Sequence, residues 1–371
     1  MTGQTFPGHK AFEDPELCRA LLNLIRERLD GPLRFMEVCG THTVSIFRSG
    51  LRSLLPDGIT HLSGPGCPVC VTHDRELALC MELAEKDNAT IATFGDLMRV
   101  PGPNRKNLKQ AKALGADIEV VYSPLDALKL ARERKGREVV FLGVGFETTA
   151  PTVAATIQMA EREGLPNFSV LAFHKLVPPV LEALLSAEPD AQENSGIDAF
   201  LLPGHVSTIL GIEPYLFVAE RYGKPGVIAG FETADILQSL LLMIDMRRER
   251  KPEIKNQYCR AVDDKGNNRA RDIMFSVFEP SEALWRGIGA IPGSGLAIKD
   301  AYASFDARRR FELDLQDVPE VRGCKCGDVL KGRITPNQCP LFGKACTPAN
   351  PVGPCMVSTE GSCAAYFKYA Y

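Results

Sequence analysis

Short apolar runs alternate with amphipathic helical patterns between about residues 11 and 250. β-Branched and aromatic residues fill the shorter runs and turn-forming residues bound them, which predicts strands. Alternation of strands with helices is typical of parallel sheets covered by helices. The predicted strands are 33–38, 58–62, 90–94, 118–122, 139–142, 168–172, 199–202 and 226–229.

About eight strands are better divided between two α/β domains than placed in one sheet. We expect these domains at 11–117 and 118–250, facing each other across a cleft. The first helix is predicted to begin at Asp14 and Pro15, which suit the N-cap and the first helical position. Further helices are predicted at 75–85, 107–114, 125–133 and 153–163.

The pattern changes after residue 250, and we expect a third domain at 251–371. Segments 257–262 and 270–278 are interpreted as an antiparallel hairpin joined by a polar turn, with a glycine-rich loop at 285–295. Six of the twelve cysteines lie in the last 48 residues, among glycines and prolines. A loop-rich segment with so little core is expected to draw stability from a metal centre.

Composition narrows the class of protein. The 371 residues are 45% hydrophobic and 24% charged with a net charge of −3, which gives no general attraction to nucleic acid or to anionic membrane. No apolar stretch approaches the roughly 20 residues that span a bilayer, and the N-terminus lacks a signal-peptide pattern. We therefore expect a cytoplasmic protein, in which clustered cysteines indicate metal or redox chemistry more often than structural disulfides.

Polar and reactive residues follow several predicted strands. In parallel sheets, ligands bind beyond the carboxyl ends of the strands, so these loops are expected to converge on one cleft. The alternative is a purely structural role. The glycines and threonines would then form turns and helix N-caps, and His174 and His205 would be hydrogen-bonded polar residues without a catalytic task. The loops are CGTHT at 39–43, GPGCPVC at 64–70, GFETT at 145–149, His174-Lys175 and PGHVS at 203–207.

Cys39 stands alone in a Gly/Thr/His loop ahead of a predicted helix. A helix N-terminus lowers the pKa of a nearby thiol, so we expect a lowered pKa and a reactive or metal-ligating cysteine, with a buried and inert thiol as the alternative. Cys67 and Cys70 form a CxxC that opens a helix. We interpret them as a reversible disulfide, since no second CxxC or HxxxH completes a zinc site.

The cysteine-rich tail holds more thiols than one iron–sulfur cluster needs. Cys324 and Cys326 are too close in sequence to ligate one cubane comfortably. One suitable ligand set leaves Cys324 and Cys355 free as a second dithiol near the cluster, and a structural zinc site using four of the six cysteines is the alternative. That ligand set is Cys326, Cys339, Cys346 and Cys363.

Five motifs in order resemble the HypD family of [NiFe]-hydrogenase maturation proteins. They are CGTHT, GPGCPVC, GFETTAP, PGHVS and the tail CKCGDVLKG…CPLFGKACTP…GPCMVSTEGSCAAY, and the resemblance covers nearly the whole chain. It implies two α/β domains facing a cleft, plus a small cysteine-rich iron–sulfur domain. It also implies a redox-active scaffold that assembles Fe(CN)2CO with the chaperone HypC and receives cyanide from HypE, rather than a conventional turnover enzyme.

The resemblance also implies roles for single residues. Cys39 would hold the iron of Fe(CN)2CO, with His42 as a nearby ligand or proton donor, and Cys67 with Cys70 would be the redox pair of the cleft. Glu147 and His205, in the GFETT and PGHVS loops, join the candidate catalytic set. The [4Fe-4S] ligands would be Cys326, Cys339, Cys346 and Cys363. We expect electrons to pass from the cluster through Cys324 and Cys355 to Cys67 and Cys70, and then to the iron at Cys39.

Two other functions remain open at the level of sequence. An iron–sulfur-dependent protein disulfide reductase would use the same CxxC and cluster, but it would not need a third unpaired thiol such as Cys39. A zinc-stapled binding module would have no labile sulfide. Retention of iron cyanide by Cys39 separates the assembly scaffold from both.

Overall fold

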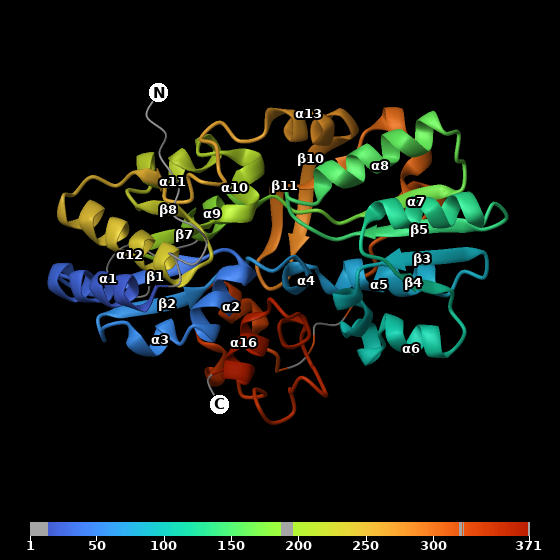
Figure 1. Cartoon of the computed structure of the whole chain (residues 1–371). Coiled ribbons are helices and arrows are strands. Elements are labelled where there is room, and N and C mark those ends of the chain that lie inside the picture. Colours follow the sequence, from blue (N-terminus) through green and yellow to red (C-terminus); the bar gives the residue numbers. More distant parts are fainter. Residues whose placement is uncertain (1–13, 187–195, 319–320, 322, 370–371) are drawn as a thin grey trace.

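The computed structural model describes residues 14–186, 196–318, 321 and 323–369. The expectation about a signal peptide falls largely on residues 1–13, outside these ranges. The chain forms two parallel sheets flanked by helices, a two-stranded hairpin between them and a cysteine-rich C-terminal region (Figure 1). The predicted α/β class, with its two parallel sheets and its cysteine-rich region, is confirmed.

The first sheet has five parallel strands in the order β2-β1-β7-β8-β9. Successive side chains of a strand face opposite sides. Accordingly, Phe35 packs in one core with α1 and α12, while Met36 packs in another core on the opposite face. The strands are β1 (Leu33–Glu37), β2 (Ile59–Ser63), β7 (Ala199–Pro203), β8 (Gly226–Ala229) and β9 (Ile254–Asn256).

The second sheet has four parallel strands in the order β4-β3-β5-β6. Its strands are apolar on both faces, as expected of a parallel sheet covered on both sides. The hairpin consists of two longer antiparallel strands, β10 and β11. These strands are β3 (Ala89–Thr93), β4 (Ile118–Val120), β5 (Glu138–Gly143), β6 (Phe168–Ala172), β10 (Phe278–Trp285) and β11 (Gly289–Ile298).

Helices connect the strands and cover the sheets (Figure 1). Asp14 caps α1 as predicted, because its carboxylate accepts a 2.9 Å hydrogen bond from the backbone N–H of Glu16. The α-helices are α1 (Pro15–Arg28), α2 (Gly40–Arg48), α3 (Leu51–Leu54), α4 (Pro68–Val71), α5 (Asp74–Ala84), α6 (Leu108–Ala113), α7 (Pro124–Glu133), α8 (Ala150–Arg162), α9 (Val177–Ser186), α10 (Gly204–Leu210), α11 (Leu216–Glu220), α12 (Thr233–Arg248), α13 (Asn268–Val277), α14 (Ala307–Arg310), α15 (Cys326–Leu330) and α16 (Ser362–Tyr369). The 3₁₀ turns are η2 (Gly95–Arg99), η3 (Pro103–Arg105), η4 (Glu213–Tyr215), η5 (Asp300–Phe305), η6 (Pro336–Gln338) and η7 (Pro354–Met356).

The sheets divide the chain differently from the expected ranges 11–117 and 118–250. β3 and β4 lie on either side of that boundary, yet they pair in one sheet. β7, β8 and β9 return to the sheet that begins with β1 and β2. The five-stranded domain is therefore discontinuous, and the four-stranded domain is inserted between β2 and β7.

The hairpin expected at 257–262 and 270–278 was wrong. Residues 268–277 form α13, whose N-cap Asn267 accepts a 3.0 Å hydrogen bond from Ala270 N–H, and the helix packs against α8. The observed hairpin lies immediately after it, and the segment 285–295 that was expected to be a glycine-rich loop forms its tip and most of β11. Its prolines and glycines lie on a two-stranded ribbon, where both strands are edges and tolerate them.

This hairpin holds both segments that connect the two sheets. Between β2 and β3, Thr72 pairs with Trp285, and between β6 and β7, Lys175 pairs with Gly295. The ammonium group of Lys175 is buried and donates 2.8 and 3.0 Å hydrogen bonds to the carboxylate of Glu76. The hairpin therefore contacts both of the segments that connect the two domains.

The cysteine-rich region packs beneath the five-stranded domain, where α16 contacts α2 (Figure 1). The rings of Phe47 and Tyr366 lie 4.5 Å apart, and the guanidinium of Arg52 lies 4.4 Å from the centre of the Tyr366 ring. An aromatic contact therefore attaches this region to α2, and a cation–π contact attaches it to α3.

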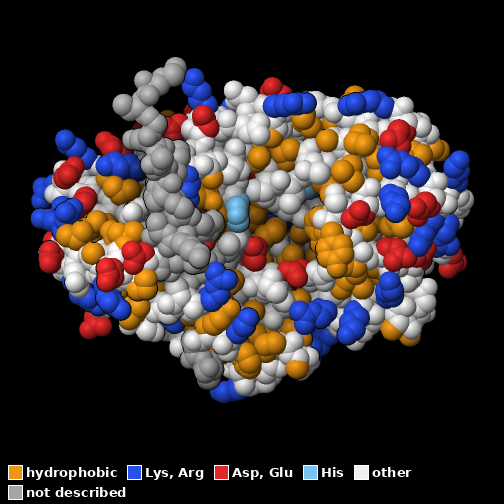
Figure 2. All heavy atoms as spheres, in the orientation of Figure 1, with side chains coloured by type: hydrophobic (Ala, Val, Ile, Leu, Met, Phe, Trp, Pro, Cys, Tyr) orange, Lys and Arg blue, Asp and Glu red, His pale blue; other side chains and the backbone are white. Residues whose placement is uncertain are grey.

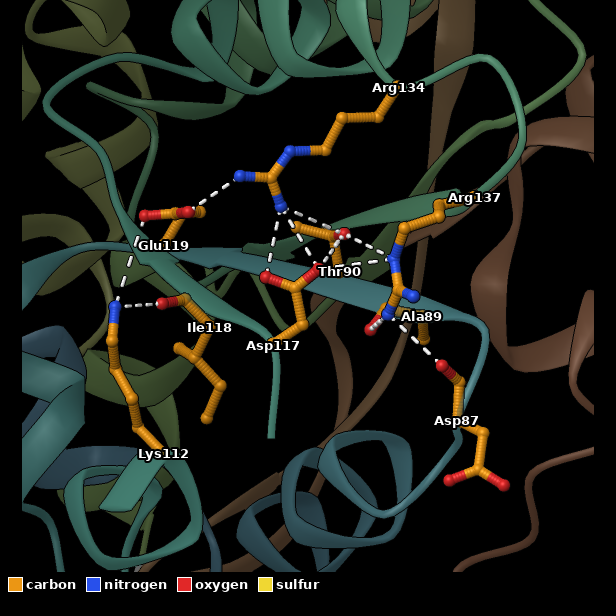
Figure 3. A network of polar contacts seen from close by, with 9 residues as sticks. All are labelled: Asp87, Ala89, Thr90, Lys112, Asp117, Ile118, Glu119, Arg134 and Arg137. Carbon is orange, nitrogen blue, oxygen red and sulfur yellow. Dashed lines mark hydrogen bonds and ion pairs between the residues drawn. The ribbon is translucent and has the colours of Figure 1, made fainter. Parts of the chain in front are cut away.

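Charged side chains fix the amino-terminal edge of the four-stranded sheet (Figure 3). Arg134 donates to both carboxylate oxygens of Asp117, at 2.9 and 3.0 Å, and to Glu119 at 2.7 Å. Arg137 reaches Asp117 and the side chain of Thr90. This network stabilises the edge of the sheet opposite to the loops that follow its strands.

Within the described ranges, no helix has the length and apolar character needed to cross a membrane.

Candidate functional site

A cavity of about 480 Å³ lies between the two sheets, at the carboxyl ends of their strands. In the five-stranded sheet the chain order reverses between β1 and β7, and in the four-stranded sheet between β3 and β5. Residues that follow all four of these strands line the cavity. Both topological switch points, where open parallel sheets bind ligands, therefore face the same space.

Figure 2 shows this face of the molecule, with a hollow near its middle and a histidine and acidic side chains beside it. The lining is largely apolar, with a few polar groups from both domains and from the C-terminal region. Such a mixture is typical of small-molecule sites. The polar and ionisable residues of the lining include Cys39, Thr41, Asp96, Thr148, Thr149, His205, Ser358 and Glu360.

Cys39 lies at the end of β1 and at the N-cap of α2, as the sequence predicted. Its thiol does not have the lowered pKa that was expected. Burial raises the pKa of Cys39 to about 12, and the carboxylate of Glu360 adds to the effect. Desolvation outweighs the favourable helix N-terminus here, so a cation bound to the sulfur would be needed to hold it as a thiolate.

Glu37 fixes the loop that carries Cys39. This carboxylate is fully buried and accepts a 2.9 Å hydrogen bond from Cys39 N–H and a 2.5 Å hydrogen bond from the Thr43 hydroxyl. His61 lies 3.8 Å from it. Burial raises the pKa of Glu37 against the opposing effect of these partners. The sequence analysis missed Glu37, although an acidic residue inside the apolar run 35–38 was a usable signal.

Glu360 brings the C-terminal region into the site. Its carboxylate accepts a 2.8 Å hydrogen bond from the Thr41 hydroxyl. A Cβ atom on Gly40 would stand 2.5 Å from the Cβ of Glu360, so the two backbones meet closely at a position that admits only glycine. Nothing in the local sequence around Glu360 pointed to this contact.

His42 and His205 pack on the two sides of one aromatic ring. The Phe231 ring centre lies 4.6 Å from that of His42 and 4.0 Å from that of His205. His42 is fully buried, and its Nε2 lies 3.0 Å from the carbonyl oxygen of Gly230. Burial lowers the pKa of His42 to about 4, so its ring is neutral at pH 7 and donates through Nε2. His205 is exposed on the cavity lining, and partial burial also lowers its pKa.

Glu147 is buried between two residues of the cavity lining, Phe146 and Thr148. Its Oε1 accepts a 2.8 Å hydrogen bond from Val177 N–H, while Oε2 has no hydrogen-bond partner. Burial raises the pKa of Glu147 to about 8. The group is therefore a carboxylic acid at pH 7, held in the wall of the cavity.

Cys67 and Cys70 form a disulfide at the start of α4. Both sulfurs are buried, while the neighbouring Gly66, Pro68 and Val69 line the cavity. The disulfide therefore lies directly behind the wall of the cavity. His174, by contrast, is buried against Phe278 in the four-stranded domain and lies outside the cavity lining.

The six tail cysteines line a second, much smaller cavity. Their arrangement differs from the expected pairing of Cys324 with Cys355, because Cys355 Sγ lies 2.7 Å from Cys326 Sγ. Cys324 instead packs against Gly353, where a Cβ atom would stand 2.8 Å from its sulfur. A spacing of two residues could not show which thiol faces which neighbour. The cavity is lined by Cys324, Cys326, Cys339, Cys346, Cys355 and Cys363, with Leu341, Phe342, Gly353 and Met356.

The tail thiols differ in how they are packed. Cys326 and Cys355 are buried members of the apolar core that contains Cys67 and Cys70, and Cys324 and Cys363 also pack against this core from partly buried positions. The hydrogen bond from Cys355 lowers the pKa of Cys326, which Arg286 also lowers, and the same hydrogen bond raises the pKa of Cys355. Cys326 is therefore the member of the pair that more readily forms a thiolate.

The other four cysteines, at 324, 339, 346 and 363, pack around Phe342 and Met356. Backbone N–H of Val352 donates a 3.3 Å hydrogen bond to Cys346 Sγ, an arrangement that suits a thiolate ligand. In the described part of the chain, no three His, Cys, Asp or Glu side chains converge closely enough for a single metal ion. Four thiols around a shared apolar space fit the larger [4Fe-4S] cubane by donor type.

The sequence of the chain is similar to those of known hydrogenase maturation factors. The family model for HypD, described as "Hydrogenase formation hypA family", matches residues 16–370. The chain is 48% identical over 370 residues to the hydrogenase maturation factor HypD of Rhodobacter capsulatus, covering 96% of this chain and 97% of that protein. It is 46% identical to HypD2 of Bradyrhizobium diazoefficiens, covering 96% and 95%, and 43% identical to HypD of Escherichia coli, covering 96% of each. The chain therefore belongs to the HypD family of hydrogenase maturation factors.

Proposed function

We propose that this hydrogenase maturation factor assembles the Fe(CN)2CO group on Cys39, with HypC as the chaperone that shares the iron and HypE as the source of cyanide. The observation that carries the proposal is a lone thiol in a cavity formed by the switch points of two sheets. A thiolate suits low-spin iron that carries cyanide and CO. The largely apolar lining offers few groups that would hold water beside such a group.

The residues around Cys39 have defined tasks in this proposal. Glu37 and Thr41 fix the loop, and iron at the sulfur displaces the thiol proton, which the high pKa of Cys39 otherwise retains. Neutral His205 offers a hydrogen-bonding group on the cavity lining, while the carboxylic acid of Glu147 lies buried beside the lining and holds the backbone of Val177. We expect His205 to orient the diatomic ligands and not to ligate the iron itself.

The tail cysteines supply electrons in this proposal. Cys324, Cys339, Cys346 and Cys363 would hold a [4Fe-4S] cluster, which revises the ligand set expected from sequence by exchanging Cys326 for Cys324. When bound, the cluster would supply single electrons. Cys326 and Cys355 would pass two electrons to the Cys67–Cys70 disulfide behind the cavity wall, since α4 packs against η7, which carries Cys355.

An infrared spectrum of the purified chain with HypC and HypE tests the assembly function. Bands of metal-bound cyanide and CO are expected with the wild-type chain and are expected to be lost in the Cys39→Ala variant. A Cys39→Ala variant that keeps these bands would overturn the role of Cys39. A wild-type chain that reduces protein disulfides but never shows the bands would favour the disulfide reductase.

A further inference from the structure

The tip of the β10–β11 hairpin lies between the two pairs of redox cysteines. Trp285, the last residue of β10, is fully buried in the core that also contains Cys67, Cys70, Cys326 and Cys355. Its indole N–H donates a 2.8 Å hydrogen bond to the Ser294 hydroxyl, which fixes the ring on the hairpin. The residues that follow Trp285 contact the segments of both cysteine pairs.

Arg286 forms hydrogen bonds with the segment that follows the Cys67–Cys70 disulfide. Its backbone N–H donates to Val71 O at 2.9 Å, at the end of α4, and its Nε donates to Thr72 O at 3.0 Å. Its two terminal nitrogens donate to the two oxygens of Asp74 at 2.8 and 2.7 Å. Arg286 is only 8% exposed, and its four hydrogen bonds join the end of α4, the short helix that carries Cys70, to the start of α5 at Asp74.

The next residue, Gly287, meets the segment that carries Cys326. A Cβ atom on Gly287 would stand 2.2 Å from the Cα of Gly327, and Gly287 has a φ of +70°, so only glycine fits. Gly327 directly follows Cys326. Two adjacent residues of the hairpin tip thus hold the disulfide segment on one side and the Cys326 segment on the other.

We propose that Arg286 is a positioning residue for thiol–disulfide exchange between Cys326/Cys355 and Cys67–Cys70. The inference rests on the electron relay of the proposed function and adds the element that aligns its two pairs. Exchange requires the attacking sulfur to approach the S–S bond in a narrow geometry. The fork of Arg286 fixes one partner, and the contact of Gly287 with Gly327 fixes the other.

The two cysteine pairs supply all the bonds, electrons and protons that the exchange requires. The Cys326 thiolate bonds to one sulfur of Cys67–Cys70, the S–S bond breaks, and the other sulfur leaves as a thiolate. The Cys355 thiolate then attacks Cys326, forms a Cys326–Cys355 disulfide and releases the second cleft sulfur. Two electrons pass to Cys67 and Cys70, which also take up the two protons that Cys326 and Cys355 lose.

The rate of this transfer can be measured in the full chain with its reconstituted cluster and with both pairs oxidised. Photoreduced deazaflavin supplies electrons under anaerobic conditions, and samples are quenched in acid, alkylated and analysed by mass spectrometry. In Arg286→Gln we expect reduction of Cys67–Cys70 to slow by about tenfold or more, while reduction of Cys326–Cys355 keeps its rate. Arg286→Lys keeps the charge but loses the fork, and it is expected to remain slow.

A matched control is available in Arg134→Gln. Arg134 also donates two hydrogen bonds to an aspartate, Asp117, but it lies at the amino-terminal edge of the four-stranded sheet (Figure 3). We expect this variant to transfer electrons at the wild-type rate. Asp74→Asn weakens the same fork while leaving Arg286 in place, and it serves as the second variant if Arg286→Gln folds poorly.

A positioning role also predicts that the redox midpoint of Cys67–Cys70 stays constant. Equilibration of Cys67–Cys70 with glutathione buffers is expected to give the same midpoint in Arg286→Gln and in the wild type, because alignment changes the rate and not the end point. A wild-type transfer rate in Arg286→Gln, an equal slowing in Arg134→Gln, or a midpoint that shifts in step with the rate would each overturn the proposal.

The relay itself is tested by Cys326→Ser in the same assay. If this variant reduces Cys67–Cys70 as fast as the wild type, the relay fails and the role of Arg286 fails with it. If Cys326→Ser blocks the transfer while Arg286→Gln does not slow it, the relay stands and only the role of Arg286 is refuted.

Discussion

Glu360 accepts a 2.8 Å hydrogen bond from Thr41, and this bond joins the cysteine-rich region to the loop of Cys39. The same carboxylate lines the central cavity and contributes to the raised pKa of Cys39. The C-terminal region therefore takes part in the cavity directly, besides carrying the proposed cluster. The acid–base behaviour of Cys39 is set partly by a residue from the far end of the chain.

Replacement of Glu360 by Gln is expected to make Cys39 more reactive. With a pKa of about 12 instead of 9.0, the thiolate of Cys39 is about a thousandfold scarcer at pH 8 than that of an ordinary cysteine. Gln removes the negative charge and can still accept from Thr41, so we expect the alkylation of Cys39 by iodoacetamide to accelerate several-fold. Mass spectrometry of the labelled chain measures the rate.

Asp96→Asn is the control for this change, because it removes a carboxylate from the same cavity that is not among the main causes of the raised pKa of Cys39. It is expected to leave the rate nearly unchanged. Alkylation of wild-type Cys39 at the rate of an exposed cysteine would contradict the prediction.

Glu147→Gln is expected to change how stability depends on pH. The pKa of Glu147 is raised from 4.5 to about 8 in the folded chain, so folding favours the protonated form. The stability that this group contributes is fully present below about pH 4.5 and is lost as pH rises through about 8. The loss is on the order of 5 kcal/mol at most.

Urea unfolding of both proteins at pH 5 and at pH 9 measures this effect. Gln is neutral at both pH values and keeps the acceptor for Val177 N–H, so the variant should gain stability relative to the wild type as pH rises. A difference in unfolding free energy that stays constant between the two pH values would show that Glu147 is already ionised at neutral pH.

Cys324→Ser and Cys326→Ser are expected to differ in iron content. Cys324 packs with the thiols that we assign to the cluster, whereas Cys326 Sγ lies 2.7 Å from Cys355 Sγ. Loss of Cys324 should therefore remove most of the iron and labile sulfide, while loss of Cys326 should leave both nearly complete. Colorimetric iron and sulfide assays on anaerobically purified protein distinguish the two, and the reverse result would restore the ligand set expected from sequence.

Gly353→Ala is expected to disturb the cluster site without unfolding the domains. An added Cβ would stand 2.8 Å from Cys324 Sγ and must displace it. We expect a lower iron content after reconstitution and an altered visible spectrum. Gly136→Ala is a suitable control because nothing lies within 4 Å of its added Cβ. Equal iron content in both variants would show that Cys324 is free to move.

The local elements of this fold could be predicted from sequence, but their partners could not. Strands such as β6 and β8 match their predicted bounds, because short apolar runs between turn residues carry a local signal. The pairing of β1 with β7 is a contact between distant segments, and no local pattern encodes it. The expected domain ranges therefore followed chain order where the sheets do not.

The segment 270–278 shows a different limit. Its apolar residues alternate enough to suggest a strand, but Asn267 caps a helix there and α8 offers a surface for its apolar side. For the candidate site, Cys39 and His205 line one cavity and Cys67 and Cys70 lie directly beside it, while the roles predicted for these residues stay predictions. Burial, which reverses the expected pKa shift of Cys39, depends on packing that the sequence does not display.

The pairing of Thr72 and Lys175 to one hairpin has a mechanical consequence for the cavity. A hinge opening of the domains would have to break backbone contacts at both connections in the same movement. We therefore expect the hairpin to limit a hinge opening, so that the cavity beside Cys39 changes little in width. A group that enters such a cavity would be selected by its size, since the opening would not widen to admit a larger one.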